Sequence, residues 1–150
     1  LMETPDAEPE ASTGLAGDFG CTEEPSAHMP TNTGGDPIRL FLFEMKDGMM
    51  AGSDVMEGAD AVAVDPDHYA VEYENEAVRV LRITYGAGEA GIEHGHPANC
   101  IVWLQVDDSA ENPSAVGDWA CNDAGVHTPG GNANPVELVA IEFKGRLTAQ

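Results

Sequence analysis

The sequence predicts an all-β fold, and two observations carry that prediction. From His68 onward, short runs of β-branched and aromatic residues alternate with polar ones, and turn signals separate them roughly every 8 to 12 residues. Almost no stretch shows the apolar repeat of an amphipathic helix. Many short strands divided by turns are typical of a small sandwich or barrel.

The first expected strands follow one another closely. Apolar and polar residues alternate over 69–73, a turn is expected at 74–76, and a second strand at 78–85. The apolar face of this second strand switches between Val80 and Leu81, which indicates either a bulge or a strand buried on both faces.

Two glycines then turn the chain into a strand that holds His94 and His96. A buried strand is expected over 101–104, a polar turn over 107–116, and three short strands after it. At 59–64 we expect one short helical turn or a strand leading into the barrel.

Composition excludes several classes of partner. The 150 residues, about one domain's worth, include 27 acidic against six basic side chains, for a formal net charge of −21. Such a surface repels nucleic acids and anionic membranes. No run approaches the roughly 18 apolar residues of a membrane span, and no signal peptide is recognisable. We therefore expect a cytoplasmic protein by default, with a periplasmic one left open because the chain begins at Leu1.

Two parts of the sequence repeat one another. The matching pairs, in the same order, are 16–21 with 116–121, His28 with His127, and 37–46 with 135–144. The first copy contains only the part that corresponds to residues about 101 to 144. A half barrel leaves an unpaired edge and an uncovered apolar face, so we expect it to pack on the complete copy, on another chain or on upstream sequence.

The histidine-rich stretch resembles a known family. Gly88, His94 and His96 have the spacing of the first cupin motif, and the segment from Gly117 through Gly125, His127 and Asn132 is similar to the second. The resemblance implies a cupin-type double-stranded β-helix, or jelly-roll barrel, with a partial second copy. The implied units are the back half of a first copy at 1–47, a linker at 48–65, and a complete barrel at 66–147.

The same residues predict a metal site. Residues two apart in a strand share a face, so His94 and His96 point to one side, and His127 supplies a third imidazole. Neutral imidazoles bind Fe, Mn, Ni or Zn as divalent ions and leave positions open for a ligand. Metal-bound cupins usually carry a glutamate where this chain has Cys100. Cys100 is therefore either a fourth ligand or a small buried hydrophobe, and Glu93 is expected to face solvent.

Several other side chains have two readings at this stage. Arg79 or Arg82 orients a substrate carboxylate if its strand face points inward, and lies in solvent otherwise. The two tryptophans are expected in the core or the pocket wall. His68 is expected in a turn, and Cys21 and Cys121 in the core, with a disulfide between Cys100 and Cys121 left open.

The resemblance implies a small-molecule enzyme of the oxygenase, decarboxylase or isomerase type, with a divalent metal and an organic acid or similar substrate. The alternative is a non-catalytic cupin module for ligand binding or oligomerisation that has lost the motif glutamate, with or without the metal. A homo-oligomer is expected in either case, because cupins commonly pair edge strands in dimers.

Overall fold

The computed structural model describes residues 13–15, 17–22, 29–44, 58–96, 100–106, 117–122 and 125–144. One short helix and five strands are assigned there: α1 (Ala61–Val64), β1 (Tyr69–Glu74), β2 (Val78–Tyr85), β3 (Cys100–Gln105), β4 (Trp119–Asn122) and β5 (Val136–Phe143). No helix in this part of the chain is both long and apolar enough to cross a membrane.

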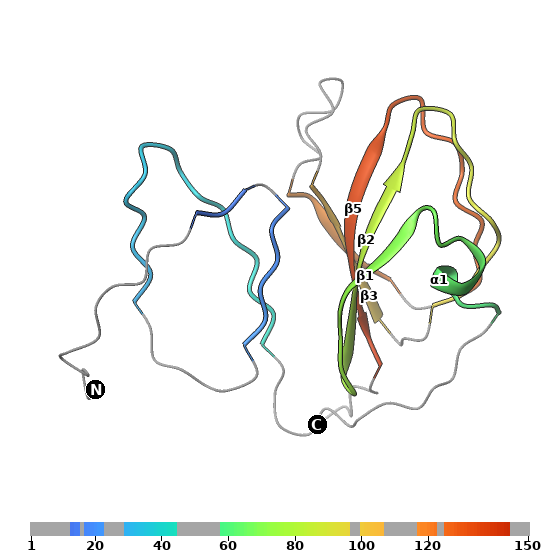
Figure 1. The fold of residues 1–150 in the computed structure, drawn as a ribbon, viewed down its shortest axis with the longest axis horizontal. Helices are drawn as coiled ribbons and strands as arrows, with labels where there is room; N and C mark the ends of the chain where they lie inside the picture. Colours follow the sequence, from blue (N-terminus) through green and yellow to red (C-terminus); the bar gives the residue numbers. More distant parts are fainter. Residues whose placement is uncertain are drawn as a thin grey trace.

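The strands form one antiparallel sheet in the order β1-β2-β5-β3-β4 (Figure 1). The last strand in sequence, β5, therefore lies at the centre, where it pairs with β2 from Val136↔Tyr85 to Phe143↔Val78 and with β3 on its other side. The prediction of a β-rich fold with almost no helix is confirmed. The predicted bounds of the second strand, 78–85, are those of β2.

Both faces of the sheet are apolar. One face carries a buried cluster of Ala61, Tyr69, Leu81, Ile83, Tyr85, Ile101 and Ala140, and the other a cluster of Val78, Val80, Val102, Val139 and Ile141. Strand β2 contributes to both clusters, so the apolar switch at Val80 and Leu81 reflects burial on two faces. The register irregularity lies instead in β1, between Val71 and Tyr73.

Local interactions fix the ends of the first elements. Asp60 caps α1 by accepting hydrogen bonds from the backbone N–H groups of Val62 and Ala63, as N-cap aspartates do. The predicted helical turn at 59–64 is thus present. Between β1 and β2, the side chain of Asn75 accepts hydrogen bonds from the backbone of Ala77 and Val78, which closes the predicted turn.

Two segments, 88–96 and 127–132, pair with each other beside the sheet face that carries Tyr69 and Leu81. Backbone hydrogen bonds join Gly88 to Asn132 at 2.7 Å and Gly91 to Pro129 at 3.1 Å, and His94 and His127 bond each other in both directions at 2.9 Å. In Figure 1 the two segments curve away from the sheet together, on the side of α1. They carry the three histidines of the predicted metal site.

The described residues of the N-terminal segment lie on the opposite side of the sheet (Figure 1). The rings of Phe43 and Phe143 pack at a tilted angle of 54°, with centroids 6.5 Å apart. No strand is assigned among the described residues of 13–44, so the expected repeat of β4 and β5 is not formed as regular structure there. Ile38, Leu40 and Leu42 are 64%, 78% and 78% exposed, which gives this segment an uncovered apolar side.

Two packing expectations are wrong. Trp119 is 61% exposed, because β4 is an edge strand that pairs only with β3. Cys21 is an exposed free thiol, in a segment that forms no strand. The side chains of Cys100 and Cys121, and residues 48–57 of the expected linker, lie outside the part of the chain that the structure describes.

Candidate metal centre

The structure brings the three predicted histidines together. The Nε2 atoms of His127 and His94 are 2.9 Å apart, and those of His127 and His96 are 3.2 Å apart. All the ligand atoms of the group lie within 4.8 Å of one another. His94 and His96 are buried and His127 is exposed. The group therefore could hold a metal ion, and His127 marks its solvent side.

Backbone pairing places these rings. His94 lies opposite His127 in an antiparallel bridge. Gly95, between His94 and His96, forms a parallel bridge with Asp60 and donates its N–H to the carbonyl of Ala59 at 2.7 Å. The histidine segment was predicted as a regular strand; it forms instead two isolated bridges to neighbours on either side. As predicted, His94 and His96 are both directed inward, whereas Glu93 is exposed.

Hydrogen bonds determine which ring nitrogen is available on two of the histidines. His94 Nδ1 is 2.7 Å from the carbonyl oxygen of Ile92, and His96 Nδ1 is 2.5 Å from Oε1 of Glu142. Both oxygens are acceptors, so each Nδ1 carries the proton and donates. The Nε2 atoms then carry lone pairs and face the centre of the group.

The surroundings of His94 and His127 favour neutral imidazoles. Burial lowers the pKa of His94, and the nearby His96 lowers it further. Burial also lowers the pKa of His127, which with the effect of His94 and His96 comes to about 4. Neutral rings are the form that ligates a metal ion.

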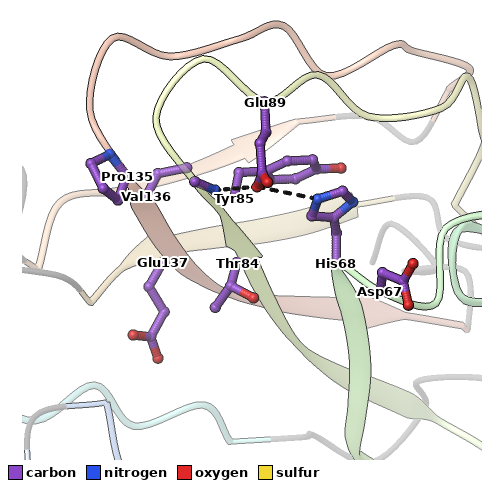
Figure 2. A pocket seen from close by; sticks show the side chains of 9 residues that line it. Asp67, His68, Thr84, Tyr85, Glu89, Pro135, Val136 and Glu137 are labelled. Atoms are coloured by element: carbon purple, nitrogen blue, oxygen red, sulfur yellow. Dashed lines mark hydrogen bonds and ion pairs between the residues drawn. The ribbon is translucent and has the colours of Figure 1, made fainter.

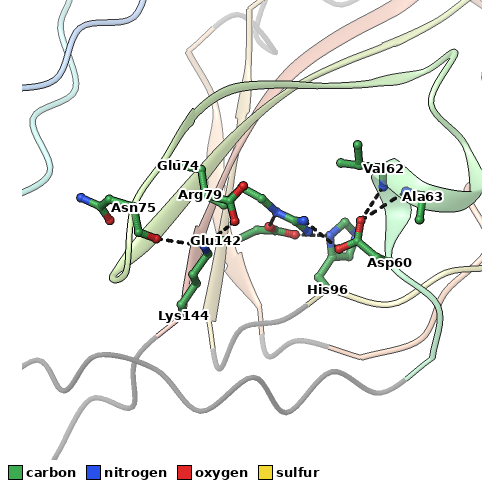
Figure 3. A network of polar contacts seen from close by, with 9 residues as sticks. All are labelled: Asp60, Val62, Ala63, Glu74, Asn75, Arg79, His96, Glu142 and Lys144. Atoms are coloured by element: carbon green, nitrogen blue, oxygen red, sulfur yellow. Dashed lines mark hydrogen bonds and ion pairs between the residues drawn. The ribbon is translucent and has the colours of Figure 1, made fainter.

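His96 is hydrogen-bonded to an ionic network that Glu142, Arg79 and Asp60 form (Figure 3). Glu142 on β5 accepts hydrogen bonds from His96 and from Nε of Arg79 on β2, and Nη1 of Arg79 donates to Asp60 at 2.7 Å. Of the two readings given for Arg79, the inward one is right, but its partners are these protein carboxylates. Arg82 lies on the other face, paired with Glu72 and Glu137.

The sequence reasoning missed Glu142. A signal was present, because period-2 alternation along β5 puts Glu142 on the same face as Leu138 and Ala140, which contribute to the first core cluster. The cross-strand register Arg79↔Glu142 supplies the cation that a buried carboxylate requires. Neither the inward placement nor the pairing follows from composition alone.

Aromatic side chains border the group. The Trp103 ring lies 5.3 Å from that of His96 and 5.9 Å from that of His127, and Tyr69 lies 4.8 Å from His94, as centroid distances. Trp103 thus packs against the core cluster beside the centre, and the core was one of the two positions expected for it. The centre is apolar on these sides and open toward His127.

The sequence matches no known family model. No curated protein matches it either.

A second polar cluster lies at the other end of the histidine segment (Figure 2). His68, in a turn as predicted, donates from Nδ1 to Asp65 at 2.6 Å and stacks on Tyr85, whose hydroxyl also bonds Asp65. The hydrogen bond with Asp65 raises the pKa of His68. His68 and Tyr85 line a pocket of about 460 Å³, together with Glu89. Asp65 joins this cluster to the metal centre through the N–H of Ile92, at 3.4 Å.

Proposed function

We propose that His94, His96 and His127 bind one divalent transition-metal ion, and that the protein is a metal-dependent cupin-type enzyme acting on a small organic acid or a similar oxygen-rich molecule. One observation carries this proposal: Nε2 of His127 lies at hydrogen-bonding distance from Nε2 of both His94 and His96, and there are too few hydrogens for both contacts.

The hydrogen count follows from the tautomers. His94 and His96 hold their protons on Nδ1, so their Nε2 atoms are acceptors only. A neutral His127 has one proton for its two Nε2 contacts, at 2.9 Å and 3.2 Å. At least one contact is then between two lone pairs, which is unfavourable without a cation. A metal ion at this point converts all three lone pairs into ligands.

The distances fit such an ion. Metal–nitrogen bonds of about 2.1 Å place two ligands about 3.0 Å apart when they meet at a right angle and about 3.4 Å apart at the tetrahedral angle. The observed separations of 2.9 Å and 3.2 Å lie near the first value. Three ligands on one side leave further positions open, and an all-nitrogen set suits Fe, Mn, Ni or Zn.

The finer fold assignment belongs to the same proposal. The sheet, the paired segments at 88–94 and 127–132, and the ligand spacing support a jelly-roll barrel of the cupin type. The sequence repeat supports a partial second copy at the N-terminus. The exposed apolar side at Ile38, Leu40 and Leu42 supports association with further protein, including a second copy of the chain.

The chain's own residues would divide the work. A bound ion would act as a Lewis acid or as an oxygen-activating centre. His94 and His96 would hold it from the buried side, and Trp103 and Tyr69 would keep water from that side. A ligand would approach past the exposed His127. A dication on three neutral imidazoles attracts anions locally, in spite of the acidic surface.

The second candidate is a non-catalytic cupin module for ligand binding. One observation favours it: the nearest described charged groups, Glu142 and Arg79, are already paired with each other. Neither is then free to move a proton on a substrate. This candidate has the same metal site as the first one, but it binds its ligand without converting it to a product.

Metal content of the purified protein, by plasma mass spectrometry, tests the proposal. We expect about one equivalent of Fe, Mn, Ni or Zn in the parent and none in a His94→Ala, His96→Ala double variant. His68→Ala, which removes a histidine outside the group, is the matched control and should keep the metal. A parent that stays empty after reconstitution refutes the site. A loaded parent without oxygen uptake or decarboxylation on a panel of organic acids favours the binding module.

A further inference from the structure

We propose that Glu142 is a positioning residue for the metal centre, acting through His96 and giving negative charge to an otherwise neutral ligand set. This inference rests on the proposed metal site. It assigns a role to a buried ionic network that the sequence did not reveal.

The contact with His96 is direct and buried. Glu142 is 0% exposed and His96 is 2% exposed, and 2.5 Å separates Oε1 from Nδ1. A carboxylate that accepts the Nδ1 proton fixes the ring's tautomer and orientation and makes the opposite nitrogen a stronger donor to a metal. His94 is treated differently, because its Nδ1 bonds only a neutral backbone carbonyl, that of Ile92.

The way Arg79 binds Glu142 argues against a purely structural ion pair. An arginine and a carboxylate usually close a two-point fork, in which Nε and the nitrogen beside it, Nη2, each bond one oxygen. Here only Nε bonds Glu142, through Oε2. Nη2 is buried and has no hydrogen-bond partner among the residues that the structure describes. The second oxygen of Glu142 is turned to His96 instead.

A buried donor without a partner is unfavourable. The arrangement therefore lacks a second bond between Arg79 and Glu142 and has a bond between Glu142 and His96 in its place. What is gained is an anionic acceptor for one imidazole of the metal group. Glu142 therefore bonds His96 with the oxygen that a two-point ion pair with Arg79 would use.

The network is anchored at its far end. Nη1 of Arg79 donates to Oδ2 of Asp60, while Oδ1 of Asp60 caps α1 through Val62 and Ala63 (Figure 3). Asp60 also pairs with Gly95, between the two buried histidines.

Co(II) binding tests the inference, because one titration gives both the affinity and a visible spectrum of the ligand field. The proteins are the parent, Glu142→Gln and Glu44→Gln, which alters the exposed glutamate at the equivalent repeat position. We expect Glu142→Gln to weaken Co(II) binding about 10- to 100-fold and to shift its absorption bands. Glu44→Gln should match the parent in both.

Glu142→Gln leaves Arg79 without its buried partner, which destabilises the fold. A second variant therefore controls for loss of folding. The double variant Arg79→Met, Glu142→Gln removes both charges, and we expect the same loss of affinity from it. Two-bond nitrogen–proton spectra of the metal-free parent give a readout without any substitution: His96 should be protonated at Nδ1.

The outcomes separate the two proposals. A parent that binds no Co(II) refutes the metal site, and the role of Glu142 with it. A parent that binds, together with a folded Glu142→Gln or double variant of parental affinity and spectrum, overturns the positioning role alone. So does an Nε2 proton on His96 in the parent.

Discussion

Replacing His127 with alanine should separate metal binding from folding. His127 is exposed, so its removal leaves no buried cavity, and its backbone bonds to His94 do not involve the side chain. Its ring takes part in both short Nε2 contacts. In the metal-free protein we therefore expect His127→Ala to melt at the parental temperature or above it.

With metal the order should reverse. An ion present at 100 times its dissociation constant stabilises the parent by about 2.7 kcal/mol. For a folded unit of 60 to 100 residues this raises the melting temperature by about 11 to 22 °C. If loss of a direct ligand weakens binding at least about 100-fold, the same metal concentration stabilises His127→Ala by at most about 0.4 kcal/mol, or about 2 to 3 °C.

Scanning calorimetry in chelator and then in Zn(II) or Mn(II) measures both effects. His68→Ala provides the contrasting control, because it removes the hydrogen bond to Asp65 but no ligand. It should melt lower without metal and keep the full metal-dependent rise. A His127→Ala protein that melts several degrees below the parent in chelator and still responds fully to metal would refute the reasoning.

Three further predictions concern the fold around the centre. Leu81→Ala, at a 0% exposed position, should lower the free energy of unfolding by about 2 to 5 kcal/mol in urea titrations, whereas Leu40→Ala should change it by less than about 0.5 kcal/mol. Gly91→Ala would place a Cβ 2.3 Å from the hydroxyl of Tyr85, so we expect a cost of about 1 to 3 kcal/mol and weaker metal binding; a neutral effect would contradict the packing described. Because its hydrogen-bonded carboxylate raises the pKa of His68 above 6.5, the stability that this pair contributes is fully present below about pH 6.5 and lost as pH rises through the folded pKa. The difference in unfolding free energy between the parent and His68→Gln should therefore shrink from pH 5.5 to pH 8.5, and a growing difference would show that the sign is wrong.

Local patterns predicted the parts of this protein that local physics determines. The alternation and β-branched residues of 78–85 fixed β2, and the Asn75 turn follows from side-chain bonds within a few residues. His94 and His96 share a face because their spacing demands it. Pairing them with His127 required the family resemblance, since no local rule links positions so far apart.

What the sequence could not reveal depends on register. Glu142 resembles a solvent-facing glutamate in a closing strand until β5 is aligned with β2, which brings Arg79 beside it. The exposure of Trp119 and Cys21 depends on which strands lie at an edge and which segments form none. These are properties of the assembled sheet.

The residues of the metal centre lie far apart in the sequence, which bears on when a metal ion can bind during folding. Contacts span 33 residues between His94 and His127, 46 between His96 and Glu142, and 63 between Arg79 and Glu142. Closing such long loops is slow. An ion that binds only after the folding transition state would stabilise contacts that are absent from that state. It would slow unfolding and leave the folding rate unchanged, so the metal would prolong the lifetime of the native protein without guiding the chain toward it.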